Sequence, residues 1–200
     1  AFAKELRSVL EEYNNPPRYL IGEVFGDAKV LKQYIGENLD GLHTVFLFEM
    51  LAFKFNADYF RGLITKLEEE FPHPYTPTWV FSNHDRKRSI SRMGNDVAKA
   101  KLLAMLQMTV RGVSYTYMGE EIGMQQVNIP LKQAKDSLAL RYKWIPQFLV
   151  NLSPESLNRD GCRTPMQWDS TAHAGFCPPS ITPWLPVTEG YKTVNVATQQ

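Results

Sequence analysis

Apolar positions follow two different periods along the first part of the chain. Between residues 2 and 13 they recur with helical spacing, which predicts a helix that ends before a pair of prolines. The apolar run at 19–21 is too short for a helix and predicts a buried parallel strand. Asp27 suits the N-cap of a short helix over 28–35, and the partly β-branched run at 42–48 predicts a second strand.

The same alternation continues beyond residue 60. Hydrophobic spacing predicts helices over 60–71, 98–110 and 131–150, and short apolar runs predict strands over 79–81 and 113–118. The middle helix is expected to start at a cap formed by Asn95 or Asp96 and to be terminated by Gly112 in the C′ position. Beyond Ser153 the sequence is rich in proline, glycine and tryptophan and predicts long loops.

Strands that alternate with helices indicate repeated βαβ units and a parallel sheet, so the predicted class is α/β. No internal repeat beyond this unit, no low-complexity stretch and no clear linker divides the sequence, and residues 1–200 are therefore interpreted as one domain. Because the chain opens on a helical pattern without a methionine, we expect the N-terminal part of a larger protein to precede it.

Composition narrows the class of partner. The 200 residues are 44% hydrophobic and 22% charged, as in a soluble globular protein, and the formal net charge is only +1. Such a balance favours neither a nucleic-acid partner nor a membrane surface, and it indicates a small or neutral ligand.

The termini and cysteines say little about localisation. Charged side chains interrupt the first thirteen residues, which excludes a signal peptide or a membrane span there. Cys162 and Cys177 are too few for a disulfide framework and are taken as reduced thiols, although one bridge between them stays open. A cytoplasmic location is favoured.

Candidate chemistry is expected where strands end, because functional groups of parallel α/β folds gather at the C-terminal ends of strands. Glu23 follows the first strand between apolar neighbours, which would favour the protonated carboxyl that a general acid needs. His84 and Asp85 follow the third strand and could form hydrogen bonds to vicinal sugar hydroxyls, and the Asp85 carboxylate could balance positive charge. Taken singly, each has a simpler explanation, a helix cap for Glu23 and a local turn for His84 and Asp85.

Other polar segments carry weaker signals. Glu120 and Glu121 also follow a strand, and a structural role in the loop is the better interpretation. The basic run at 86–88 is typical of a solvated or ion-paired loop. The histidines and cysteines match no metal-ligand spacing and no glycine-rich phosphate loop is present, so neither a metal nor a cofactor is expected.

Four segments together resemble the α-amylase superfamily of glycoside hydrolases. They are YLIGEVFGD at 19–27, VFSNHDRKRSISRMGND at 80–96, YMGEEIGM at 117–124 and RDGCRTPMQWDSTAHAGF at 159–176. The last two resemble the branch of α-glucosidases, oligo-1,6-glucosidases and trehalose or sucrose isomerases. The resemblance spans nearly the whole chain and implies a (β/α)₈ TIM barrel that cleaves α-glucosidic bonds of oligosaccharides or disaccharides with retention.

The resemblance also assigns roles to residues. Glu23 matches the acid/base and Asp85 the carboxylate that stabilises the transition state. His84 would bind sugar hydroxyls, Arg159 would help to close the pocket around the terminal glucose, and Arg88 matches an arginine that lines the site. The residues at 86 and 87 depart from the family's commoner ones, which leaves the outer subsites open.

The nucleophilic aspartate of the family has no match in this sequence and is expected before residue 1. On this interpretation residues 1–130 hold the fifth to eighth strand units, and 131–200 are a helical and loop-rich continuation. A half-barrel would expose two sheet edges, which the N-terminal half of the barrel, or self-association in its absence, should cover.

Two alternatives remain beside hydrolysis. A glucosyl isomerase or transglycosylase would use the same residues and differ in how water is kept from the intermediate. A non-catalytic barrel scaffold of the superfamily is the other, and the presence of both Glu23 and Asp85 argues against it. The sequence does not determine the preferred glucosidic linkage.

Overall fold

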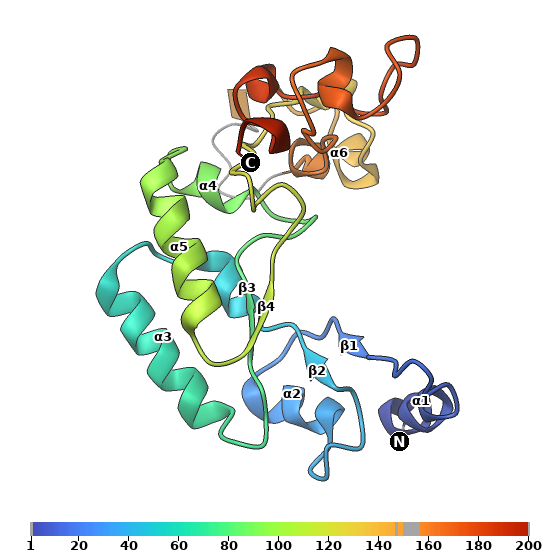
Figure 1. The fold of residues 1–200 in the computed structure, drawn as a ribbon, viewed down its shortest axis with the longest axis vertical. Coiled ribbons are helices and arrows are strands. Elements are labelled where there is room, and N and C mark those ends of the chain that lie inside the picture. The colour runs from blue at the N-terminus through green and yellow to red at the C-terminus, as the bar shows by residue number, and fades with distance from the viewer. Residues whose placement is uncertain (1, 147, 150–156, 200) are drawn as a thin grey trace. The chain divides into compact units, whose positions relative to one another are not determined.

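The computed structural model describes residues 2–146, 148–149 and 157–199. Figure 1 labels its helices and strands in chain order. The chain divides into two compact units. Unit 1 comprises Ala1–Val80 and Leu106–Tyr115, and unit 2 comprises Phe81–Met105 and Thr116–Gln200.

Unit 1 contains most of the regular structure that the hydrophobic pattern predicts. Its elements are α1 (Phe2–Glu11), β1 (Ile21–Gly22), α2 (Ala28–Ile35), β2 (Thr44–Val45), the 3₁₀ helix η1 (Phe48–Ala52), α3 (Ala57–Glu70), β3 (Thr78–Val80) and β4 (Val113–Tyr115). The bounds predicted for helix α2 are confirmed. The helix begins after Asp27, because the Asp27 carboxylate accepts a hydrogen bond from the Val30 N–H and caps the first turn. Asn56 caps α3 in the same way through the Tyr59 N–H.

The four strands pair in parallel, as predicted, in two short sheets. β1 pairs with β2 and β3 pairs with β4. The buried hydroxyl of Thr78 connects β3 to the β2 segment, since it donates to the Val45 carbonyl at 2.9 Å and accepts from the Leu47 N–H at 3.0 Å. The expected burial of the first strand is wrong for Ile21, which is exposed. Successive residues of a strand face opposite sides, and only the face at Gly22 is buried, against the side chains of Leu42 and Val45.

Gly112 occupies a position in unit 1 that only glycine fits. Its φ is +142°, and a Cβ there would lie 2.5 Å from the Pro77 carbonyl oxygen and 2.8 Å from the Trp79 ring. It lies beyond the last residue of α5, Thr109, rather than directly at the helix end as predicted. Glycine is needed here because the chain closely approaches the strand that carries Trp79, whose Nε1 donates to the Arg111 carbonyl.

Gly112→Ala is expected to lower the free energy of unfolding by about 2–3 kcal/mol, because the new methyl group strains the backbone and clashes with main-chain atoms. Gly62→Ala is the matched control, since nothing lies within 4 Å of the added Cβ in α3, and alanine there should stabilise by about 1 kcal/mol. Urea denaturation measures both. Equal midpoints for the two variants would contradict the assignment.

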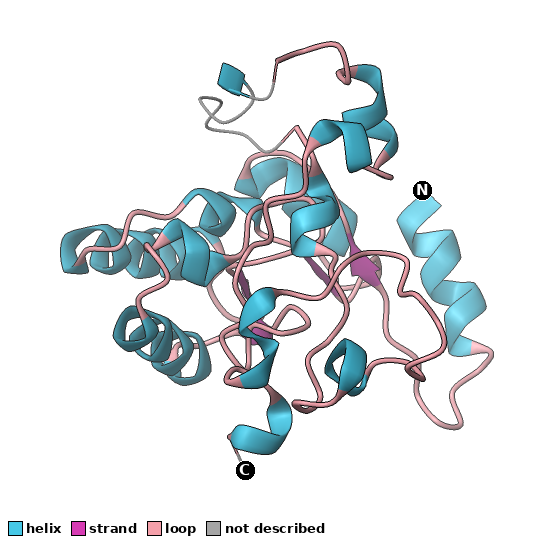
Figure 2. Ribbon diagram, turned by 90° about the horizontal axis from the view of Figure 1, so that it is seen from above, coloured by secondary structure: helices cyan, strands magenta, loops and turns pink. Residues whose placement is uncertain are grey.

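Unit 2 is built mainly from loops and short helices. Its elements are α4 (Ser89–Arg92), the start of α5 (Val97–Thr109), the 3₁₀ helix η2 (Leu131–Gln133), α6 (Ser137–Arg141), and the 3₁₀ turns η3 (Arg159–Cys162), η4 (Ala172–Gly175), η5 (Glu189–Lys192) and η6 (Val196–Thr198). The strands β1 to β4, drawn in magenta in Figure 2, all belong to unit 1. Asp96 is the residue that caps α5, through the N–H groups of Ala98 and Lys99.

The continuous helix predicted over 131–150 is wrong within the described residues. Ala134 has an extended backbone, and α6 begins only at Ser137, after Asp136 caps it through the Leu138 N–H. Aspartate side chains favour such caps over helix interiors, and here the cap divides the segment. Positions 147 and 150 of the predicted helix lie outside the described residues.

Two small apolar clusters hold unit 2 together. Ile122, Met124 and Met166 form one, and Leu131, Ala134 and Ala139 form the other. Residues 157–199 contain only short 3₁₀ turns, which confirms the predicted loops for that part. No helix among the described residues is long and apolar enough to cross a membrane.

Candidate active site

Glu23 directly follows β1 in unit 1. The residue before it must be glycine, because a Cβ at Gly22 would lie 2.4 Å from Leu42 Cδ1 and 3.0 Å from Val45 Cγ1. The Phe46 N–H donates to the Gly22 carbonyl at 2.9 Å and connects the end of β1 to the segment that directly follows β2. The strand end that carries Glu23 is therefore fixed by close backbone packing.

The Glu23 side chain is exposed, which corrects the expectation that apolar neighbours enclose it within this unit. Phe25 is 76% exposed and does not cover the carboxylate. Its ring lies 4.7 Å from the ring of Phe48 instead, centroid to centroid. Flanking side chains of an extended segment point to alternate sides, so apolar neighbours in sequence do not ensure an apolar surrounding.

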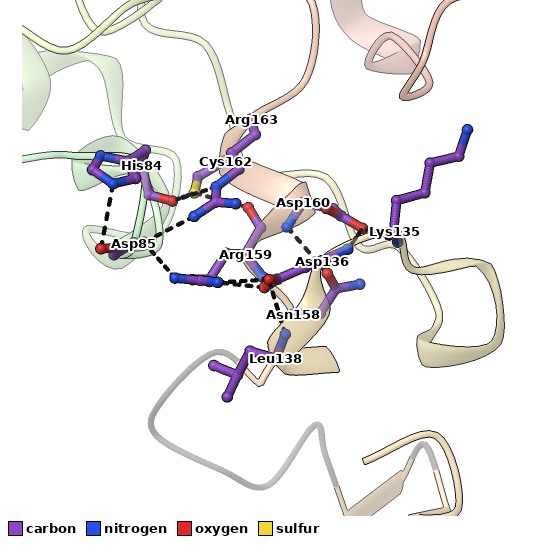
Figure 3. A network of polar contacts seen from close by, with 10 residues as sticks. All are labelled: His84, Asp85, Lys135, Asp136, Leu138, Asn158, Arg159, Asp160, Cys162 and Arg163. Atoms are coloured by element: carbon purple, nitrogen blue, oxygen red, sulfur yellow. Dashed lines mark hydrogen bonds and ion pairs between the residues drawn. The ribbon is translucent and has the colours of Figure 1, made fainter. Parts of the chain in front are cut away.

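His84 and Asp85 follow β3 and lie in unit 2 (Figure 3). The Asn83 side-chain oxygen accepts a hydrogen bond from the Asp85 N–H at 3.0 Å, which forms the local turn that the sequence also allows. His84 Nε2 lies 3.4 Å from Asp85 Oδ2. The turn thus presents an imidazole and a carboxylate side by side.

Two arginines donate to the same oxygen of Asp85. Arg159 Nη1 lies 2.8 Å and Arg163 Nη2 lies 2.9 Å from Asp85 Oδ1. Both contacts are visible in Figure 3, where the guanidinium groups approach Asp85 from the chain segment that follows residue 158. The contact of Asp85 with Arg159 brings together two residues that the resemblance placed in one site.

Asp136 holds the other side of the Arg159 guanidinium. Its Oδ2 accepts from Arg159 Nε at 2.8 Å and its Oδ1 accepts from Nη2 at 2.7 Å, and the Arg159 backbone N–H adds a third contact at 2.9 Å. The Asp136 side chain is only 1% exposed. The hydrogen bonds that Arg159 donates lower the pKa of Asp136 far below its ordinary value, and the same bonds raise the pKa of Arg159.

The turn that carries these arginines is itself anchored. Asp160 Oδ2 accepts from the backbone N–H groups of Lys135 at 2.6 Å and Asp136 at 3.2 Å. A Cβ at Gly161 would lie 2.1 Å from the Val127 carbonyl oxygen, so glycine allows the turn to approach that segment. The segment around residue 160 is thereby attached to residues 127–136.

Cys162 belongs to the same turn and is buried. Its Sγ lies 3.3 Å from the His84 carbonyl oxygen, and burial raises the pKa of its thiol to about 11. The thiol therefore stays protonated near neutral pH and is not a nucleophile there. Cys162 and Cys177 are not joined by a disulfide in the structure.

Arg88 lies in the interior of unit 2, with 2% of its surface exposed. Its Nη1 donates to the Met118 carbonyl at 2.6 Å, its guanidinium lies 5.4 Å from the centroid of the Tyr117 ring, and burial lowers its pKa. Glu120 accepts from the Ser89 hydroxyl and from the Tyr117 N–H, which supports its structural interpretation. The site-lining role of Arg88 stays a prediction.

Sequence reasoning missed Asp136 and Arg163. The helix predicted over 131–150 includes Asp136, although aspartate followed by serine before an apolar run is a signal for a cap. Arg163 lies four residues after Arg159 in the RDGCR segment, and nothing in that spacing alone separates their roles. Among the described residues, no cluster of His, Cys, Asp and Glu side chains could hold a metal ion.

Comparison with known proteins identifies the family. Residues 1–200 match the family model of the α-amylase catalytic domain. The chain belongs to the α-amylase family. A probable α-glucosidase of Rhizobium meliloti is 33% identical over 207 residues, which cover 100% of this chain and 35% of that protein. An oligo-1,6-glucosidase of Halalkalibacterium halodurans is 32% identical over 212 residues, covering 94% of the chain and 37% of the relative.

Solved structures with a similar fold include two enzymes. An α-glucosyl transfer enzyme, XgtA, has a TM-score of 0.80 and 30% identity, covering 100% of this chain and 35% of that chain. A trehalulose synthase in complex with Tris has a TM-score of 0.72 and 25% identity, covering 98% and 41%. The family is one of TIM barrels, and this chain spans a little over a third of the length of these relatives.

Proposed function

We propose that the protein hydrolyses α-glucosidic bonds of oligosaccharides or disaccharides with retention of configuration. The single observation that carries the proposal is the group of His84, Asp85 and Arg159, which the fold assembles from distant parts of the chain. The relatives named α-glucosidase and oligo-1,6-glucosidase support the reaction class.

In the proposed reaction, Glu23 protonates the departing glycosidic oxygen while a nucleophilic carboxylate attacks the anomeric carbon. As a carboxylate, Glu23 then takes a proton from the water that hydrolyses the glycosyl ester. Asp85 opposes the positive charge that develops on the sugar ring and, with His84, binds hydroxyls of the same glucose. Arg159 closes the site around that glucose.

The nucleophile is assigned to a residue outside this chain. Retaining hydrolysis needs two carboxyl groups about 5 Å apart, and no residue here matches the family's nucleophile. We place residues 1–130 as the fifth to eighth βα units of the barrel and 131–200 as their continuation. Four parallel-paired strands alternating with helices, and the partial coverage of longer relatives, support this placement.

A glucosyl isomerase or transferase is the second candidate, because similar structures include an α-glucosyl transfer enzyme and a trehalulose synthase. Both reactions share the first half of the mechanism and differ in whether water or another sugar takes up the glucosyl group.

The test uses the natural full-length polypeptide that contains this chain, with maltose, isomaltose, sucrose and trehalose as substrates. With sucrose or trehalose, which have no reducing end that would release mixed anomers, proton NMR during the first minutes should show α-glucose as the first product, because two displacements restore the original configuration. Release of β-glucose first would overturn the retaining mechanism. A rearranged disaccharide in place of free glucose would favour the second candidate, and no cleavage of any of the four sugars would remove the proposal.

A further inference from the structure

Arg163 makes a two-point contact with the His84–Asp85 turn. Its Nε donates to the His84 carbonyl at 2.7 Å, and its Nη2 donates to Asp85 Oδ1 at 2.9 Å (Figure 3). One planar guanidinium thus holds both the peptide before Asp85 and the carboxylate itself. A guanidinium suits this geometry because its donors are held in a rigid fork.

The two arginines at Asp85 have different attachments. Arg159 makes most of its hydrogen bonds with Asp136 and gives a single nitrogen to Asp85. Arg163, within the described residues, directs its side-chain hydrogen bonds to the His84–Asp85 turn. Arg163 is therefore the arginine whose removal would act on this turn first.

The backbone of Arg163 is also held in place. Its N–H donates to the Asp160 carbonyl at 3.0 Å, and the Tyr117 hydroxyl donates to the carbonyl of the preceding Cys162 at 3.1 Å. The side chain is 30% exposed, so solvent, and a small solute such as guanidinium, can reach its position. A fixed backbone and a forked side chain give the contact a defined geometry.

The contacts of the two arginines determine which oxygen of Asp85 can still accept a hydrogen bond from a sugar hydroxyl. Arg159 and Arg163 together occupy Oδ1, whereas Oδ2 faces His84 Nε2 at 3.4 Å. A carboxylate oxygen has two favourable acceptor directions, so Oδ1 has no further capacity for a sugar hydroxyl. Turning the carboxylate plane away from this orientation would break both contacts to the guanidinium groups.

We propose that Arg163 is a positioning residue that fixes the carboxylate of Asp85 with Oδ2 toward the sugar. The proposal rests on the function proposed above, to which it adds a residue with no direct contact to substrate. Misplacing a reacting group by about 1 Å costs on the order of 100-fold in rate, and this sets the effect expected when the fork is removed.

The test compares Arg163→Ala and Arg163→Lys in the natural full-length polypeptide. Both should lower kcat about 100-fold with little change in KM, because Asp85 acts mainly on the transition state. Guanidinium chloride at low millimolar concentration should raise the kcat of Arg163→Ala at least about tenfold, since free guanidinium can bind where the arginine side chain was removed. Arg61→Ala is the control, because Arg61 is an exposed arginine paired with Asp58 and should leave kcat unchanged.

Crystal structures of the wild type and of Arg163→Ala provide a readout that does not need activity. The Asp85 carboxylate should turn in the variant, with Oδ1 no longer in its wild-type position. An unmoved carboxylate, full activity of Arg163→Lys, or a loss that guanidinium does not restore at all would overturn the positioning role. A wild-type protein without glycosidase activity would remove the proposed function, while the orientation of Asp85 in the two structures would still decide the structural claim.

Discussion

Glu23→Gln should reduce kcat on maltose by about 10³-fold, because the glutamine amide cannot protonate the departing sugar oxygen. Glu23 is exposed at the end of β1, so the free energy of unfolding should change by less than about 0.5 kcal/mol. Steady-state kinetics and urea denaturation of the natural full-length polypeptide measure the two effects. A large loss of activity without loss of stability is the expected signature of a chemical role.

The choice of substrate makes this test more specific. A p-nitrophenolate leaving group needs little protonation, so the first chemical step on p-nitrophenyl α-glucoside should be much less affected than that on maltose. Glu37→Gln, an exposed glutamate of the same unit, is the matched control and should leave both rates unchanged. Equal losses on the two substrates, or near-normal activity on maltose, would show that Glu23 is not the acid.

Asp136→Ala should lower the free energy of unfolding by about 3–5 kcal/mol at pH 7. The substitution leaves the Arg159 guanidinium without the carboxylate that holds it, and removing one partner of a buried ion pair costs this much. It also deprives the Leu138 N–H of its capping acceptor. Asp58→Ala is the control, because the Asp58–Arg61 pair is exposed and should contribute less than about 1 kcal/mol.

The same pair predicts how stability depends on pH. The pKa of Asp136 is lowered in the folded protein by the hydrogen bond from Arg159, relative to about 3.9 in an unfolded chain. The contribution of Asp136 to the free energy of unfolding is therefore fully present above about pH 5 and is lost as the pH falls further, toward the folded pKa. The stability difference between wild type and Asp136→Asn should shrink between pH 5 and pH 2, and a difference that stays constant would exclude this coupling.

The local elements were predictable because their causes lie within a few residues. Helix α2 begins where Asp27 can accept from a backbone N–H three residues later, and α3 ends before the proline at residue 72. The hydrophobic spacing also located the strand ends that carry Glu23 and the His84–Asp85 turn. Those features need only the short-range geometry of helices and strands.

The error over residues 131–150 has a long-range cause. Asp136 stops a helix there because its carboxylate caps α6 and binds Arg159, which lies far along the chain. Apolar spacing does not report a partner that distant, and local propensity was overruled by tertiary contacts. The exposure of Ile21 and Phe25 likewise depends on which side of the segment another element packs against.

Sequence alone was sufficient for the α/β class, the family resemblance and the candidate residues at the strand ends, because periodicity and short motifs depend on neighbouring positions. The folded chain was needed to show that Arg159 and Arg163 share one oxygen of Asp85, that Asp136 anchors Arg159, and that Arg88 is buried. These facts join residues up to 78 positions apart, and the direction of a side chain at such a contact follows from packing in three dimensions.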